Sequence, residues 1–450
     1  NHHQKVAVFG SFYRGDSVVS GIGLIGGRIT CIQSLANFDP NGAALVMTDP
    51  ASADFSRVDH AIRADKLPYA ALLAFAMTGF IAILTETLPA GLLPQISAGL
   101  NVSEVLAGQL VTLYALGSIV AAIPLTVATR GWPRRRVLLM TVGGFLLFNT
   151  ITTFSSHYGL TLASRFLAGM AAGLSWGIMA GYARGIVPVH QQGRALAIAM
   201  LGTPVALSLG TPAGTWLGHL IGWRASFGIM SALALVLAAW IVVAVPDRPG
   251  QASAERLPLM QSLRLPGVRP VLLVVLTWML GHNILYTYIS PFLMQAGLAG
   301  RVDLVLLVFG VCSLVGIWII GMLVDRWLRW LTLISLAVFA VTALVLALAN
   351  PSPWLIYGCM AVWGLSFGGS ATLLLTAAAD SAGDHVDVVQ AMLTTSWNVA
   401  IAGGGLFGGL LLDRAGAMSF PWALLILSLI ALATVWINST HSFKPGRRQH

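Results

Sequence analysis

Charged residues are scarce in this chain of 450 residues, where Asp, Glu, Lys and Arg together make up 9%. A soluble domain usually carries about 25% charged residues, so a chain this poor in charge could not cover its surface with polar groups. The scarcity excludes an ordinary soluble enzyme. Cysteine is also rare, and the three residues at positions 31, 312 and 359 are too scattered for a disulfide framework or a zinc site.

Lysine occurs only three times, and the phosphate-binding pattern Gly-x-x-x-x-Gly-Lys-Ser/Thr is absent from the sequence. An ATP-driven motor within this chain is therefore excluded, and energy for any pumping must come from an ion gradient or a partner. The net charge of +9 is distributed between apolar blocks rather than along one face, so we expect no nucleic-acid partner. We also expect no cofactor and no metal site.

Apolar residues are abundant, at 57% of the chain or about 256 positions. A membrane-spanning helix needs about 20 predominantly apolar residues, so twelve spans would need about 240. The composition therefore predicts an all-α membrane protein with the lipid bilayer as its surroundings.

Twelve apolar blocks, bounded by charge, proline or asparagine, are long enough to cross a bilayer at about 1.5 Å per residue. They are residues 69–94, 104–128, 136–155, 158–184, 193–219, 224–245, 269–294, 302–324, 330–349, 353–379, 388–412 and 418–438. Most of the loops between them are short, so consecutive helices are expected to be antiparallel neighbours.

The blocks divide the chain into five parts. We expect a polar leader at 1–67, a six-helix half at 68–245, a linker at 246–268, a second six-helix half at 269–438 and a tail at 439–450. The leader has no signal-peptide pattern. The sequence from Met47 to the first span is typical of a natural polar leader, so we expect residues 1–46 to lie upstream of the natural start.

Lysine and arginine indicate the orientation, because they are enriched in cytoplasmic loops. With the N-terminus inside, eighteen of them fall on inner segments and three, Arg224, Arg301 and Arg414, on outer segments. This bias predicts that both termini are cytoplasmic, and we expect a bacterial inner-membrane protein.

An internal repeat relates the two halves. Residues 173–177, Gly-Leu-Ser-Trp-Gly, recur at 364–368 as Gly-Leu-Ser-Phe-Gly, with an offset of 191 residues. Two further pairs, at offsets of 196 and 202, are the basic turns at Arg130 and Arg326 and the prolines Pro89 and Pro291. Two similar six-span halves predict parallel repeats about an axis along the membrane normal.

Two charges inside the spans are candidates for function, because a charge within a membrane helix is costly. Glu86 lies beyond the middle of the first span, followed by Pro89, which leaves the Thr85 carbonyl without its helical donor and favours a kink. A carboxylate there can carry a proton. Arg165, about one-third into the fourth span, can modulate that carboxylate or hold an anion. For both residues a structural hydrogen-bonding role is the alternative.

Polar and aromatic residues inside other spans predict a substrate cavity. His282 and Tyr286 share one helix face at positions i and i+4, and an aromatic beside an amide suits a planar polar solute. Packing is the alternative for each position. The predicted cavity residues are Trp176, His282, Asn283, Tyr286, Trp397 and Asn398.

The fifth span combines glycines with two prolines. Gly210, Gly214 and Gly218 recur every four residues and form a flat stripe for close helix packing. Pro204 and Pro212 release the carbonyls of Met200 and Ser208, so this helix is expected to bend at a moving interface. The Gly-x-Ser-x-Gly pattern around Ser175 matches a hydrolase elbow, but its position within a long apolar helix favours packing.

Together these motifs resemble the major facilitator superfamily, in particular its twelve-span proton-antiporter branch. The resemblance covers about residues 68–438. It rests on Pro133-Arg-Arg-Arg136, on Leu162-Ala-Ser-Arg165-Phe-Leu-Ala-Gly169 and on the glycines and prolines of residues 202–218, which we call the ladder of the fifth span. The segments 85–94, 107–109 and 286–291 are most similar to sugar-efflux and purine-nucleoside-efflux members.

The resemblance implies a proton-coupled exporter that works by alternating access on a small-molecule substrate, as a monomer, and not an enzyme. It implies a role in proton coupling for Arg165, which we expect to modulate proton exchange at Glu86. It also implies gating and conformational roles for Arg130, Arg134, Arg135, Arg136, Gly202, Gly210, Pro212, Gly214, Gly218, Asp325 and Arg326. The family's loop between spans two and three usually has an Asp before its Arg, where this chain has Ala128-Thr-Arg130.

Three alternatives remain open at this stage. A proton-coupled importer of a nutrient would have the same spans, although the fifth-span ladder favours export. A membrane sensor would bind a ligand without flux, and an intramembrane hydrolase would require Ser175 as its nucleophile. The sequence leaves the solute open between sugars, nucleosides and amphipathic drugs.

Overall fold

The computed structural model describes residues 8–9, 19–25, 28–34, 67–188, 191–250, 263–348, 352–382, 386–440 and 442–443. The chain separates into two compact units, residues 1–66 and 67–450. The middle of the predicted linker, residues 251–262, lies outside the described residues, as does the tail from 444 onward.

The first unit contains a small antiparallel sheet in the order β1-β2-β3, which the sequence pattern does not predict. Its strands are β1 (Val8–Phe9), β2 (Val19–Ile25) and β3 (Arg28–Ser34). β2 and β3 pair from Val19 opposite Ser34 to Ile25 opposite Arg28.

The second unit is helical wherever it is described. Its first half comprises α2 (Tyr69–Gly91), α3 (Leu93–Leu100), α4 (Glu104–Ala128), α5 (Arg134–Phe154), α6 (Tyr158–Gly185), α7 (Gln192–Met200), α8 (Gly202–Val205), the π-helical turn η3 (Ala206–Gly210), α9 (Thr211–Ile221) and α10 (Trp223–Ala244). Its second half comprises α12 (Val268–Thr287), α13 (Ile289–Gln295), η4 (Ala299–Arg301), α14 (Val302–Leu348), α15 (Pro353–Gly368), α16 (Ser370–Ala382), α17 (Val386–Ala415), η6 (Ala417–Ser419) and α18 (Phe420–Ile437). This architecture confirms the predicted all-α membrane fold.

The chain crosses the membrane twelve times within the part that the structure describes, because one of its eleven long helical stretches contains two spans. In the described residues, eleven helical stretches are long and apolar enough to cross a membrane. One of them contains α14, whose 47 residues would extend about 70 Å at 1.5 Å per residue, twice the thickness of a bilayer core. The backbone of Trp327 is non-helical, with φ −136° and ψ 26°. α14 is therefore two spans joined at Trp327, where the sequence predicts separate spans at 302–324 and 330–349.

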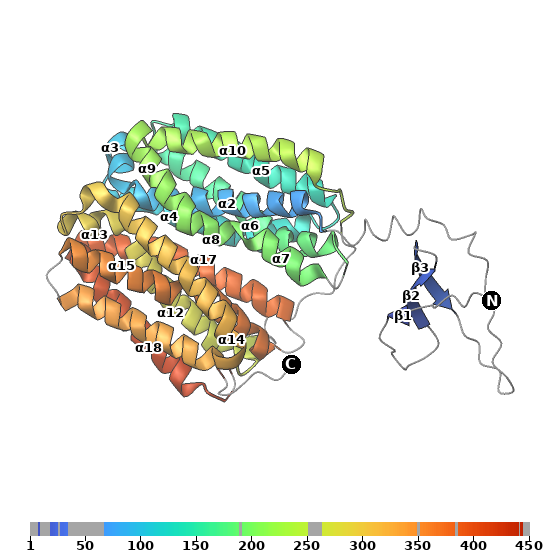
Figure 1. The fold of residues 1–450 in the computed structure, drawn as a ribbon. Coiled ribbons are helices and arrows are strands. Elements are labelled where there is room, and N and C mark those ends of the chain that lie inside the picture. The colour runs from blue at the N-terminus through green and yellow to red at the C-terminus, as the bar shows by residue number, and fades with distance from the viewer. Residues whose placement is uncertain are drawn as a thin grey trace, which may run out of the picture. The chain divides into compact units, whose positions relative to one another are not determined.

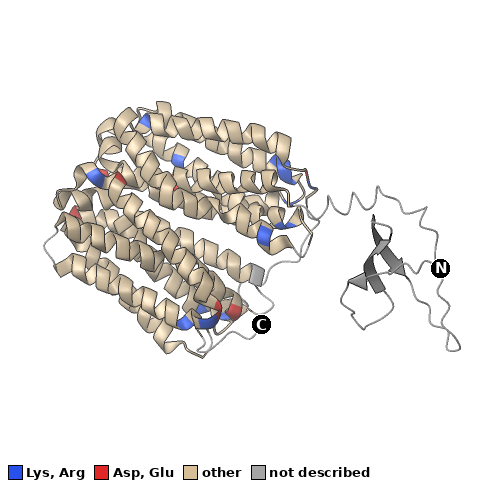
Figure 2. Ribbon diagram, viewed as in Figure 1, with Lys and Arg blue, Asp and Glu red and all other residues tan. Residues whose placement is uncertain are grey.

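The helices gather into two groups that match the two halves of the sequence (Figure 1). The first half, blue to green, lies beside the second half, yellow to red. Charged residues are found mostly toward the two ends of the bundle, with a largely uncharged middle (Figure 2). This distribution agrees with apolar surroundings between two polar boundaries.

Local sequence explains several helix boundaries. Ser103 and Ser352 precede α4 and α15, and each hydroxyl accepts a hydrogen bond from the backbone N–H three residues later. Gly222 adopts φ +88° in the sharp turn from α9 to α10, and Gly416 adopts φ +75° after α17. Glycine is the residue that takes up such positive φ angles without steric cost.

Glycines hold the same helix pair together in both halves. Gly169 and Gly173 of α6 lie directly against the backbone carbonyls of Tyr114 and Ser118 in α4. Correspondingly, Gly364 and Gly368 of α15 lie against the carbonyls of Phe309 and Ser313 in α14. All four residues of the first set are 195 positions before their counterparts. The internal repeat is therefore real. The helix contacts correspond at an offset of 195 residues, however, whereas the repeated motifs at 173–177 and 364–368 correspond at an offset of 191.

The first helix of each half breaks close to its proline. α2 contains Pro89, ends at Gly91 and is followed by α3 after a break at Leu92. α12 gives way to α13 at Tyr288, three residues before Pro291. A proline cannot donate the backbone hydrogen bond that would continue the helix, so both spans change direction at the same end of the bundle.

The fifth span bends as its prolines predict. A π-helical turn at Ala206–Gly210 lies between Pro204 and Pro212 and separates α8 from α9. The Ser208 carbonyl, which Pro212 cannot bond, lies directly against Gly310 of α14 in the other half. The bend therefore forms part of the contact between the halves.

Candidate functional site

Glu86 and Arg165 are both enclosed within the first half. Arg165 is fully buried and Glu86 is 7% exposed. Their charges interact through space, but both terminal nitrogens of Arg165 lack a hydrogen-bond partner among the described residues. The two side chains are therefore close enough to influence each other without being hydrogen-bonded.

Aromatic rings enclose the Arg165 guanidinium. Its central carbon lies 4.7 Å from the ring centre of Tyr114 and 5.5 Å from that of Phe227. Nε donates a long hydrogen bond of 3.5 Å to the carbonyl of Leu110. Cation–π contacts strengthen when they are shielded from water, so these rings hold the cation in place while leaving two nitrogens free.

The helix around Glu86 is fixed by bonds from neighbouring helices. The Tyr114 hydroxyl donates to the Ala82 carbonyl at 2.8 Å, and Asn149 Nδ2 donates to the Thr85 hydroxyl at 3.0 Å. Neither Tyr114 nor Asn149 is a residue that the sequence singles out, because each looks like an ordinary member of an apolar span. They position α2 rather than bond to the carboxylate.

A cluster of aromatic rings fills the middle of the second half. His282 lies parallel to Phe367, with ring centres 3.7 Å apart and planes at 6°. It also contacts Tyr286 at 5.1 Å, which agrees with the predicted common face. We call this set the aromatic cluster: Trp278, His282, Tyr286, Phe309, Phe339, Trp363 and Phe367.

Four polar atoms of the aromatic cluster have no hydrogen-bond partner among the described residues. They are Trp278 Nε1, His282 Nδ1, the Tyr286 hydroxyl and Trp363 Nε1. The Tyr286 ring contacts those of His282 and Phe309. Its helix α12 packs against α2, which carries Glu86, so the aromatic cluster and the site around Glu86 lie on neighbouring helices of the two halves.

The remaining predicted cavity residues lie elsewhere. Asn283 donates to the Met279 carbonyl of its own helix at 2.8 Å and packs against Gly404 of α17. Trp176 packs in the first half beside Gly79. Trp397 packs in a small apolar cluster between α4 and α17, and Asn398 donates to the Thr394 carbonyl at 3.0 Å. The structure brings together only His282 and Tyr286 of the six.

The two halves meet at the end of the bundle where α2 and α12 break. The Tyr288 hydroxyl of α12–α13 donates to the Gly405 carbonyl at 2.7 Å, and Gln109 Nε2 of α4 donates to the same carbonyl at 3.2 Å. Ser290 donates to the Ala90 carbonyl at 3.1 Å. We call these contacts the clasp. Tyr288 and Ser290 fall within the segment 286–291, which resembles efflux members of the family, but the sequence alone gives no sign of their hydrogen-bond partners.

The predicted gating residues of the basic turn pack against the end of the first half. Arg134 N donates to the Arg248 carbonyl at 2.8 Å, and Arg135 N donates to Asp247 Oδ1 at 3.3 Å. Asp247 thus supplies an acceptor for a turn that lacks the usual Asp before Arg130. Arg136 is exposed, as are Asp325 and Arg326 beside the Trp327 kink.

The glycine ladder of the fifth span packs along α2. Gly202 lies against the Ala76 carbonyl, and Gly210 faces the Phe80 ring. Gly214 and Gly218 face Leu88 and Leu92. The ladder therefore joins the bent fifth span to the helix that carries Glu86, while any role in gating is a separate proposal.

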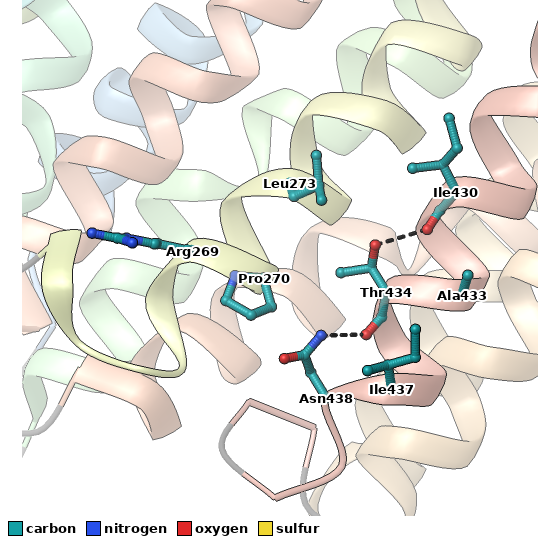
Figure 3. A pocket seen from close by; sticks show the side chains of 8 residues that line it. All are labelled: Arg269, Pro270, Leu273, Ile430, Ala433, Thr434, Ile437 and Asn438. Atoms are coloured by element: carbon teal, nitrogen blue, oxygen red, sulfur yellow. Dashed lines mark hydrogen bonds between the residues drawn. The ribbon is translucent and has the colours of Figure 1, made fainter.

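A shallow groove of about 440 Å³ lies between the first turns of α12 and the last turns of α18 (Figure 3). It is lined by Arg269, Pro270, Leu273, Ile430, Ala433, Thr434, Ile437 and Asn438. It contains none of the predicted site residues, and its lining is mainly apolar. In the described part of the chain, no group of three or more His, Cys, Asp or Glu side chains is arranged to hold a metal ion.

Comparison with known families accounts for this architecture. The family model of the Major Facilitator Superfamily matches residues 75–402 and 302–449. The chain belongs to the major facilitator superfamily.

Two curated relatives within this superfamily extend over most of the chain. A "Probable sugar efflux transporter" of Helicobacter acinonychis (strain Sheeba) is 26% identical over 375 residues, which cover 83% of this chain and 95% of the relative. The "Purine ribonucleoside efflux pump NepI" of Escherichia coli O6:K15:H31 (strain 536 / UPEC) is 29% identical over 357 residues, covering 78% and 89%.

A solved structure shares the superfamily fold. It is a bacterial homologue of the human lysosomal transporter Spinster in an inward-facing, occupied conformation. It is 16% identical, gives a TM-score of 0.67 and covers 84% of this chain and 98% of its own. At this identity the likeness concerns the fold.

Proposed function

We propose that this protein is a secondary active transporter that exports a small polar solute, a sugar or a nucleoside, in exchange for protons. The relatives named as efflux proteins match most of the chain. The observation that supports the coupling is a buried carboxylate, Glu86, in the same half as the buried Arg165, whose two terminal nitrogens have no hydrogen-bond partner among the residues that the structure describes. Buried ionisable groups in membrane helices are typical of proton pathways. We expect no enzymatic activity.

In this proposal the carboxylate of Glu86 gains and loses the proton, and Arg165 modulates it. When the acid is ionised, the two free nitrogens of Arg165 can attract it. When it is protonated, that attraction is lost. Because α2 also packs on the bent fifth span, a small movement of Glu86 is transmitted to the η3 contact with α14.

Transport would proceed by alternating access of the two halves. The clasp lies at the end of the bundle that the charge bias predicts to be outside, and we infer from it an inward-facing state. We propose that the protein works as a monomer in a bacterial inner membrane, with both termini cytoplasmic. The basic turn Arg130–Arg136, the ladder at Gly202–Gly218 and the pair Asp325 and Arg326 are proposed to control the movement. Trp176, Asn283, Trp397 and Asn398 are proposed as further lining of the pathway, together with His282 and Tyr286.

The test is proton-driven transport by full-length protein in proteoliposomes. An imposed pH gradient should drive accumulation of lactose or inosine by the unmodified protein, and Glu86→Gln should lose most of this gradient-driven component while keeping downhill exchange. Glu104→Gln is the matched control, because Glu104 begins α4 at the bundle end and lies half-buried. Undiminished accumulation by Glu86→Gln would remove Glu86 from the coupling role.

The importer and the sensor predict different results in the same assay. Inverted membrane vesicles reverse the orientation, so an exporter accumulates solute in them and an importer does not. A sensor would bind solute without any flux. The bent, proline-flanked fifth span in contact with the second half favours a moving transporter over a static sensor.

A further inference from the structure

We propose that the aromatic cluster binds the base of a nucleoside, a flat heteroaromatic ring, between α12 and α15. This inference rests on the proposed export function and names its substrate class. It distinguishes between the two solute classes that the relatives' names offer.

The first argument is the unpaired polar atoms. Trp278, Trp363, Tyr286 and His282 are each at least nine-tenths buried, and each has a polar atom without a hydrogen-bond partner in the described part of the chain. A buried polar group left unpaired loses its hydrogen bonds to water without replacement, and such groups in native proteins call for an explanation. Four such atoms within one cluster of rings, one of them on His282 itself, indicate a place where a ligand supplies the missing partners.

The second argument is the kind of partner these atoms require. The indole N–H groups of Trp278 and Trp363 are donors only, and the Tyr286 hydroxyl can donate as well. An occupant must therefore present several acceptors at the edge of its ring. The carbonyl oxygens and ring nitrogens of a nucleobase provide such acceptors in one plane, whereas the hydroxyls of a sugar point outward around a puckered ring.

The third argument is the stacking geometry. The His282 and Phe367 rings are parallel at 3.7 Å, which is the arrangement that a base adopts on an aromatic side chain. A base can replace one ring of this pair and keep the stacking contact. Stacking of a base on an aromatic side chain is favourable, so the exchange preserves the apolar contact and adds hydrogen bonds.

The position of the cluster fits a transported ligand. Trp278 and Trp363 lie near the middle of their spans, and binding sites of secondary transporters lie near the bilayer midplane. The helix that carries Tyr286, α12, packs against α2, which carries Glu86. A base bound here would therefore lie beside the proposed proton site, where one occupant can influence the other.

The experiment measures binding and export with full-length protein and three probes: inosine, uridine and lactose. Trp363→Phe and Trp278→Phe keep an aromatic ring and remove one N–H donor. We expect each to weaken nucleoside binding by about tenfold, the value of one lost hydrogen bond to a buried donor. Trp354→Phe is the matched control, because Trp354 is on α15 as well but is 85% exposed. It should bind inosine like the unmodified protein.

Different outcomes identify which idea is wrong. If lactose is exported and both buried Trp→Phe variants export it normally, while neither nucleoside binds, the nucleoside assignment is overturned and the export function stands. If nucleosides bind the Trp278→Phe and Trp363→Phe variants as tightly as they bind the unmodified protein, the aromatic cluster is not their site. If no probe crosses the membrane with the unmodified protein, the proposed function itself fails.

Discussion

The side-chain amide of Gln109 donates a hydrogen bond to the backbone carbonyl of Gly405, and this bond joins α4 of the first half to α17 of the second. The Tyr288 hydroxyl donates to the same carbonyl. Gly408 and Gly409 of α17 leave room for the Tyr288 ring, which a side chain at either position would displace. The clasp therefore combines a shared acceptor with a close approach of helices.

Tyr288→Phe should loosen this end of the bundle. The substitution keeps the ring and removes the donor to Gly405, and an interhelical hydrogen bond within a membrane is worth about 0.6 kcal/mol. We expect about a threefold shift toward the state with the clasp open. Spin labels at His157→Cys and Ala299→Cys, in a variant without the native cysteines, report the distance between the halves by pulsed electron resonance.

Tyr357→Phe is the control for the clasp, because Tyr357 is a half-buried tyrosine on α15 that is not part of it. Its distance distribution should equal that of the parent. An unchanged distribution in Tyr288→Phe would show that the hydrogen bond does not hold the closed state.

Gly169→Ala should destabilise the first half. A methyl group at this position would meet the Tyr114 carbonyl, so α4 and α6 must separate. Overpacking of a close contact usually costs about 1–3 kcal/mol, and the apparent Tm of the purified protein in detergent should fall by several degrees. Gly181→Ala in the same helix, with no atom near the new methyl group, should leave Tm unchanged or slightly higher.

The same pair of substitutions is available in the second half, where Gly364→Ala meets the Phe309 carbonyl and Gly358→Ala meets open space. We expect the same order of Tm values. Equal stability of Gly169→Ala and Gly181→Ala would contradict the carbonyl contact as the reason for glycine.

Arg329→Gln should loosen the end of α18. Arg329 donates to the carbonyls of Val435 at 2.7 Å, Trp436 at 2.9 Å and Phe443 at 3.2 Å. Unpaired carbonyls at a helix C-terminus are satisfied well by a cation. Amide hydrogen exchange over residues 435–443 should become about 10- to 100-fold faster.

Arg326→Gln is the comparison for this exchange measurement. Arg326 is exposed and lies three residues before Arg329, on the other side of the Trp327 kink. Exchange at 435–443 should be unaffected by it. Equal acceleration by both substitutions would indicate a general loss of charge at this end rather than loss of the three bonds.

The spans, their pairing into halves and the bend of the fifth span could be predicted because each depends on local composition. About 20 apolar residues specify a span, and Pro204 and Pro212 specify where a helix loses backbone bonds. The position of Glu86 and Arg165 inside the bundle follows from their place within spans. These features need no knowledge of which helices are neighbours.

The partners of these residues could not be predicted, because they come from distant parts of the chain. Nothing near Gln109 identifies Gly405 as its acceptor, and nothing near Arg329 identifies the end of α18. Asn283 resembles a cavity residue in sequence, yet its amide bonds back to Met279. The leader sheet also escaped prediction, since β2 and β3 contain no strict alternation of apolar and polar residues.

The glycine–carbonyl contacts fix the correspondence between the halves at 195 residues rather than at the 191 of the repeated letters. A difference of four residues is slightly more than one helical turn, or about 6 Å along a helix. Anyone who builds a symmetric ancestor of this transporter, or exchanges α6 for α15 to make a chimera, should align Gly169 with Gly364. If the two helices were aligned by the repeated Gly-Leu-Ser motif instead, the grafted helix would place larger side chains against the backbone carbonyls of its new neighbour, where only glycine fits.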